Sequence, residues 1–106
     1  MAREIFELSQ GFPKEERYSL TDQMRRSSRS IGAQVAEAWG KRRYEMHFIL
    51  KLTDADAEQL ETQHWLETAA DIGYLKRDDA EKICDALREI GKMLNSMMVK
   101  GKLFCS

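Results

Sequence analysis

Apolar residues in this chain recur every three or four positions, the spacing that gathers side chains on one face of an α-helix. Four stretches have this period, at roughly residues 2–10, 19–39, 42–71 and 78–99. Pro13 separates the first two stretches, because proline lacks the donor that a helix interior needs. Gly40 and Gly73 follow the second and third, where glycine commonly ends helices. The pattern therefore predicts four helices.

A single proline and few β-branched runs argue against an all-β fold. Short connections make consecutive helices antiparallel. A length of 106 residues suits one domain with one core. We therefore predict an all-α fold, an up-down antiparallel four-helix bundle with a short first helix, formed by residues 1–106 as a single domain.

Three local features refine the second and fourth helices. Ser19 with Asp22, and Asp78 with Glu81, have the spacing of a capping box, which predicts that each pair caps the start of its helix. Gly32 lies inside the second helix, where glycine costs about 1 kcal/mol relative to alanine. We therefore expect either a close approach of another element or a bend at Gly32.

The third helix is apolar on two sides. One stripe contains Phe48, Leu52, Ala55, Leu66 and Ala70. The other contains Met46, Leu50, Ala57 and Leu60 and ends near His64 and Trp65. A helix with two apolar faces must be covered on both, by two partners within the bundle or by one from another subunit. We expect an oligomer, with the interface formed by Met46, Leu50, Leu60 and Trp65.

The composition is typical of a soluble helical protein, with 42% hydrophobic and 33% charged residues. No apolar run approaches the ~20 residues that span a membrane, and residues 3–8 do not form a signal-peptide core. We therefore expect a cytoplasmic protein without membrane contact. Cys84 and Cys105 are then expected as free thiols.

Charge is segregated along a chain whose net charge is only −1. Residues 23–43 have a net charge of +5, whereas residues 52–75 have −6 and contain no lysine or arginine. Guanidinium groups suit phosphates, so one hypothesis is that a basic face binds RNA or DNA. The candidate residues are Arg25, Arg26, Arg29, Lys41, Arg42 and Arg43. The alternative is that they pair with the acidic third helix, and a pI near 6.1 counts against a dedicated nucleic-acid binder.

The other notable polar residues are more simply explained by helix packing than by catalysis or ligand binding. Gln34, Asp56, Gln59 and Gln63 could form a polar core that fixes helix register, with a small-ligand pocket as the alternative. Glu61 and His64 have the Glu-x-x-His spacing of dinuclear iron bundles, but the second copy that such a site needs is missing. No Ser/His/Asp or Cys/His set and no phosphate loop is evident. We therefore expect no metal, no cofactor and no enzymatic activity.

Several segments together resemble the 23S rRNA intervening-sequence protein family, also described simply as four-helix-bundle proteins. The resemblance covers residues 12–98, and its pieces are Phe12–Thr21, Gln23–Arg26, Ser30–Ile31, Val35–Glu37, Leu60–Gln63 and Ile72–Leu75. The chain departs from the usual family pattern after Ile31, at Ala38, at residues 53–56, at Gln59 and in its short first helix. It is therefore similar to a divergent subgroup.

The resemblance implies a bacterial four-helix bundle, assembled as a ring-like homopentamer, with no known enzymatic activity. Some relatives are encoded within ribosomal RNA insertions, and the similar accessory protein of diversity-generating retroelements is thought to bind nucleic acid. Two hypotheses follow. The first is a non-enzymatic, self-assembling adaptor that contacts RNA, DNA or the ribosome through its basic face. The alternative is a purely structural or protein-binding oligomer.

Overall fold

A computed structural model describes residues 1–105, and within them every regular element is helical. In chain order the elements are α1 (Ala2–Ser9), a 3₁₀ turn η1 (Lys14–Glu16), α2 (Leu20–Gly40), α3 (Glu45–Asp71), α4 (Arg77–Val99) and a short α5 (Gly101–Phe104). The predicted all-α bundle is confirmed. No helix in residues 1–105 has the length and apolarity needed to cross a bilayer.

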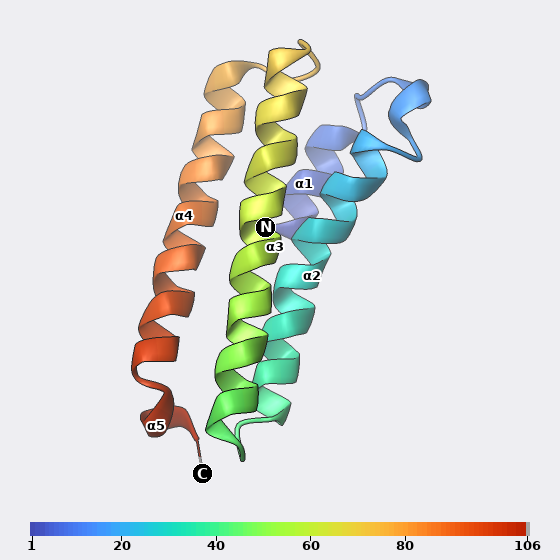
Figure 1. The fold of residues 1–106 in the computed structure, drawn as a ribbon. Coiled ribbons are helices and arrows are strands. Elements are labelled where there is room, and N and C mark those ends of the chain that lie inside the picture. The colour runs from blue at the N-terminus through green and yellow to red at the C-terminus, as the bar shows by residue number, and fades with distance from the viewer. Residues whose placement is uncertain (106) are drawn as a thin grey trace.

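The long helices α2, α3 and α4 run antiparallel, with α3 in the middle and packed along both neighbours (Figure 1). The molecule is elongated, with extents of 47 × 24 × 17 Å. At 8 residues, α1 is far shorter than the 27-residue α3, and it packs beside α2 in the half of the bundle away from α5. One half therefore contains α1 beside the three long helices, and the other contains the three long helices closed by the short α5.

The core divides into two clusters along this axis. The first gathers residues from all four helices, including Ile5, Met24, Leu66 and Leu87, each fully buried. The second lies in the half that α1 does not reach. Its buried members are Ala38, Phe48, Leu52, Ala55 and Leu94. Phe104 of α5 closes this end, with its ring 6.0 Å from that of Phe48.

Both predicted capping boxes are wrong. Ser19 precedes α2, but its hydroxyl donates to Glu16 Oε1 at 2.7 Å instead of accepting from the α2 backbone. The turn η1 brings Glu16 within reach, so the hydroxyl has a local partner that sequence spacing did not reveal. α4 begins one residue before Asp78, and the residue preceding it is Lys76, which makes no side-chain cap.

The close approach expected at Gly32 occurs instead at Gly91. A Cβ on Gly32 would meet no atom within 4 Å, whereas one on Gly91 would lie 2.8 Å from Gln59 Nε2 and 3.2 Å from Asp56 Oδ1. The absence of a side chain at Gly91 therefore lets α4 pack directly against the polar side chains of α3.

Candidate functional site

Arg25, the first of the predicted basic residues, attaches α1 to α2. Its Nε donates to Ser9 Oγ at 2.8 Å, and Nη2 donates to the carbonyl oxygen of Phe6 at 3.5 Å. The guanidinium carbon also lies 4.5 Å from the centroid of the Phe6 ring. Both hydrogen bonds of Arg25 are therefore directed at α1.

Arg26 pairs with the acidic third helix. Its Nη2 lies 2.5 Å from Glu61 Oε2, and Nη1 lies 3.7 Å from Glu58 Oε2. Trp65 Nε1 donates to the same Glu61 oxygen at 3.0 Å. Arg26 therefore makes the contacts that the alternative hypothesis predicted, since it pairs with the acidic third helix. Arg29, one turn further along α2, is exposed and forms no ion pair within residues 1–105.

The remaining predicted cations lie consecutively in the connection between α2 and α3, flanked by two aromatic residues. Trp39 is 52% exposed and Tyr44 58% exposed. Arg42 Nη1 donates to the Trp39 carbonyl oxygen at 2.9 Å, and its guanidinium carbon lies 4.1 Å from the indole centroid. The Arg43 guanidinium lies 5.9 Å from the Tyr44 ring. Lys41 is exposed beside them.

α5 lies at this end of the bundle (Figure 1), and two further cations lie in it or directly before it. A Cβ on Gly101 would lie 3.4 Å from Glu45 Oε1, so the start of α5 lies against the start of α3. Lys100 and Lys102, on either side of Gly101, are exposed. We call this surface the basic end, and it comprises Trp39, Lys41, Arg42, Arg43, Tyr44, Lys100 and Lys102.

Two carboxylates lie near the basic end, but its five cations outnumber them. Glu37 accepts from Lys51 Nζ at 2.9 Å, and this hydrogen bond, with the charge of Lys51, lowers the pKa of Glu37. Glu45 lies in the first turn of α3, where a negative charge complements the helix dipole. Sequence reasoning missed Lys100 and Lys102 because they lie more than fifty positions after Tyr44, and only the antiparallel packing of α4 brings them back.

The predicted polar core forms in part. Gln63 Nε2 donates to Gln59 Oε1 at 2.7 Å, and Gln59 Nε2 donates to Asp56 Oδ1 at 2.9 Å. Gln59 is buried where α3 meets α4 at Gly91. Gln34 is not part of this chain and instead accepts from Lys51 Nζ at 3.4 Å. The interaction is thus confined to one helix and its seam with α4.

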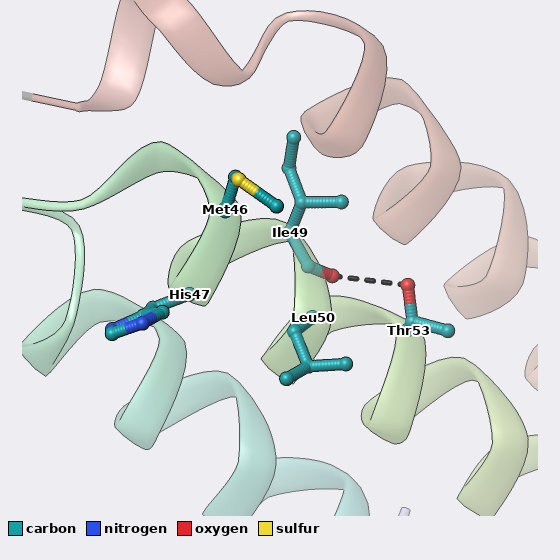
Figure 2. A pocket seen from close by; sticks show the side chains of 5 residues that line it. All are labelled: Met46, His47, Ile49, Leu50 and Thr53. Atoms are coloured by element: carbon teal, nitrogen blue, oxygen red, sulfur yellow. Dashed lines mark hydrogen bonds between the residues drawn. The ribbon is translucent and has the colours of Figure 1, made fainter.

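The second apolar stripe of α3 is exposed. Met46, Leu50 and Leu60 are 83%, 58% and 55% exposed, whereas Trp65 is half-buried against the first core cluster and so does not share this surface. A shallow apolar hollow of about 360 Å³ lies at the start of the stripe. Thr53 Oγ1 donates to the Ile49 carbonyl oxygen at 3.0 Å, the hydrogen bond drawn in Figure 2. The hollow is lined by Met46, His47, Ile49, Leu50 and Thr53.

The Glu-x-x-His pair is not assembled as a ligand set. Glu61 is engaged by Arg26 and Trp65, and the ring of His64 lies 4.7 Å from that of Trp65. Nowhere in residues 1–105 do three His, Cys, Asp or Glu side chains gather in an arrangement suited to a metal. Cys84 and Cys105 are both free thiols, and burial raises the pKa of each.

Comparisons with known proteins agree with this fold. Residues 1–96 match a family described as 23S rRNA-intervening sequence protein. A solved structure is similar over most of its length: a protein of unknown function from the S23 ribosomal protein family of Bacteroides thetaiotaomicron. The two chains share 30% identity, with a TM-score of 0.78, over 92% of this chain and 87% of the other. No curated protein matches.

Proposed function

The chain belongs to the 23S rRNA-intervening sequence protein family, and from that premise we propose that it is a non-enzymatic, self-assembling helical adaptor that binds single-stranded RNA or DNA at its basic end. The observation that carries the proposal is the pairing of exposed rings with cations, Trp39 with Arg42 and Tyr44 with Arg43. Neither the description of the family nor that of the similar structure names a reaction.

The chemistry of the basic end suits a single strand. Cations attract the phosphate backbone, and exposed aromatic side chains provide surfaces on which unpaired bases stack. Bases in a duplex are already stacked on one another, so Trp39 and Tyr44 favour an unpaired strand. Since the net charge of the whole chain is −1, binding depends on this local concentration of cations.

The proposal reassigns the predicted contact residues. Arg25 and Arg26 are directed at α1 and α3, so their loss is expected to affect stability more than nucleic-acid binding. Lys41, Arg42 and Arg43 keep the proposed role, and Lys100 and Lys102 are added to it. Arg29 faces solvent between the two groups.

Self-assembly forms the second part of the proposal, and the exposed stripe of Met46, Leu50 and Leu60 supports it. Contiguous apolar surface on a small soluble protein commonly marks an interface. The family resemblance favours a homopentamer. A ring would repeat the basic end once per subunit and raise the local density of cations without any change in the sequence.

Fluorescence anisotropy with a labelled single-stranded RNA, and with the matching DNA, tests the nucleic-acid part. The double change Arg42→Ala with Arg43→Ala is expected to weaken binding at low salt and to flatten the salt dependence, by about 0.7 in log–log slope for each lost phosphate contact. The matched control is Arg88→Ala with Lys92→Ala, which removes the same charge from α4, where both residues pair with acidic neighbours. If both variants lost affinity equally, binding would depend only on total charge, and a specific site at the basic end would be contradicted.

The alternative function, a purely structural or protein-binding oligomer, is favoured by the Arg26 contacts with Glu58 and Glu61. It predicts an intact oligomer that binds neither single- nor double-stranded RNA or DNA even at low salt. Size-exclusion chromatography run beside the anisotropy titration separates the two functions.

A further inference from the structure

A second group of cations surrounds a cavity at the other end of α2, where the chain turns from α1 through η1. We call it the elbow cavity; its volume is about 230 Å³. Lys14, Arg17 and Arg25 are among its eight lining residues, and none of the eight is a carboxylate. The volume is below the roughly 300–1,000 Å³ of pockets for drug-sized ligands, so it suits a small anion.

The first turn of α2 lies against this cavity through Thr21. Within residues 1–105, the N–H groups of Leu20, Thr21 and Asp22 find no backbone acceptor, and the preceding Ser19 supplies no side-chain cap. These free donors and the positive end of a 21-residue helix favour negative charge. Asp22, the acid of the same turn, is not part of the lining.

Thr21 is an independent sign of a missing partner. It is only 6% exposed, and its Oγ1 has no hydrogen-bond partner in the described part of the chain. Buried hydroxyls are normally hydrogen-bonded. Threonine adopts two χ1 rotamers in helices, so the hydroxyl has a second orientation open to it on a side chain that lines the cavity.

Arg25 contributes a preorganised cation. Ser9 and Phe6 hold its guanidinium group through Nε and Nη2. No hydrogen bond or ion pair within residues 1–105 involves Nη1. A guanidinium group fixed on one edge can still bind a phosphate oxygen with the other. Glu16, one of the two carboxylates on η1, accepts from Ser19.

We propose that the elbow cavity binds a phosphate monoester or inorganic phosphate. Arg17, Arg25 and Lys14 neutralise the anion, and the Thr21 hydroxyl and the first turn of α2 donate to its oxygens. This site lies at the opposite end of α2 from the basic end and does not depend on the function proposed there. The phosphate group comes either from the terminus of a nucleic acid or from a small molecule.

Isothermal titration calorimetry of the full chain with inorganic phosphate, at constant ionic strength in chloride, tests the site. Saturable binding of one phosphate per chain is expected. Thr21→Val keeps the side-chain shape and is expected to weaken binding roughly tenfold or more, the usual effect of losing a hydrogen bond to a charged group. Arg17→Ala is expected to weaken it as well, whereas Arg77→Ala, an exposed residue paired with Asp71, leaves binding unchanged.

Melting curves without phosphate control for folding. Thr21→Val removes an unpartnered hydroxyl, so its melting temperature is expected to equal or exceed that of the original chain. Absence of saturable binding at millimolar phosphate would overturn the proposal. An affinity in Thr21→Val and Arg17→Ala as high as that of the original chain would overturn it as well.

Two oligonucleotides of the same sequence, one with a 5′-phosphate and one with a 5′-hydroxyl, identify the source. Tighter binding of the phosphorylated strand, lost in Thr21→Val, supports a nucleic-acid terminus. Phosphate binding without this preference supports a small-molecule source. The variant lacking Arg42 and Arg43 is expected to retain phosphate binding, so failure at the basic end and failure at the elbow cavity remain distinguishable.

Discussion

At the scale of single residues, Gly32 and Gly91 lie inside long helices but have opposite surroundings. A side chain at Gly32 would lie in open space. A Cβ at Gly91 would lie closer to Gln59 Nε2 than real Cβ contacts allow. The Gln59 amide cannot move freely, because it is hydrogen-bonded to both Asp56 and Gln63. The same substitution therefore has opposite expected effects at the two sites.

Gly32→Ala is expected to raise the free energy of unfolding by about 1 kcal/mol, since alanine is the better helix former. Gly91→Ala gains the same propensity but must displace Gln59 and strain its hydrogen bonds, so we expect a net loss of stability. Urea unfolding of both variants at matched protein concentration measures this difference. Equal stabilisation by the two changes would show that Gln59 can move away from a Cβ at position 91 without loss of stability.

Tyr74 provides a pH-dependent signal near the first core cluster. Burial raises its pKa, and the negative charge and hydrogen bond of Glu16 raise it further. A raised pKa means that the folded state retains the phenol proton. The corresponding contribution to stability is therefore full below the ordinary pKa of about 10 and is lost as the pH rises through the folded-state value.

In an absorbance titration of tyrosinate, Tyr74→Phe is expected to remove a phase above the ordinary phenol pKa while the other tyrosine signals remain. The stability of Tyr74→Phe should also fall less than that of the original chain as the pH rises above 10. If Tyr74→Phe instead removed a phase at the ordinary phenol pKa, that result would contradict burial of the Tyr74 hydroxyl.

At the scale of elements, α1 depends on contacts with α2. An isolated helix of 8 residues is not stable in water, so packing must hold it. Ile5 packs it into the core, and Arg25 holds its C-terminal end through Ser9 and Phe6. These contacts give Arg25 a structural role, in addition to the anion contact proposed for its free Nη1 at the elbow cavity.

Arg25→Ala is accordingly expected to lower the free energy of unfolding by roughly 1–3 kcal/mol, from a lost charged hydrogen bond and cation–π contact. Hydrogen exchange should quicken in residues 2–9 before it quickens in α3. Arg29→Ala, four residues along the same helix, is exposed and should change stability by less than about 0.5 kcal/mol. Similar losses at both positions would argue against an anchoring role.

Much of the arrangement of the helices and of their buried faces could be predicted from the sequence. The spacing of Phe48, Leu52 and Leu66 identified the buried stripe of α3, because periodicity depends only on local geometry. The capping box at Ser19 failed because its hydroxyl donates to Glu16, and the one at Asp78 failed because α4 begins one residue earlier. α5 and the return of Lys100 to the basic end depend on long-range packing, to which local patterns are insensitive.

At the scale of the whole molecule, the exposed stripe of α3 leads to a prediction about mass. Multi-angle light scattering at micromolar concentration is expected to give a multiple of the 12.3 kDa chain mass. Leu50→Glu should shift the protein toward the monomer, because burying an unpaired carboxylate at an apolar interface is costly. Ile72→Glu is the matched control, since Ile72 is similarly exposed but lies in the turn after α3. A single 12.3 kDa species for the original chain would exclude self-assembly.

The uneven length of the helices has a consequence for how the molecule opens. The half that contains α1 has nine buried core residues, and the half closed by α5 has five. Local opening is easier where fewer buried contacts resist it, so the α5 half should fluctuate apart while the other half stays folded. The basic end lies on that weaker half. A ligand bound there would suppress the fluctuation, and part of its binding free energy would be spent on ordering the protein.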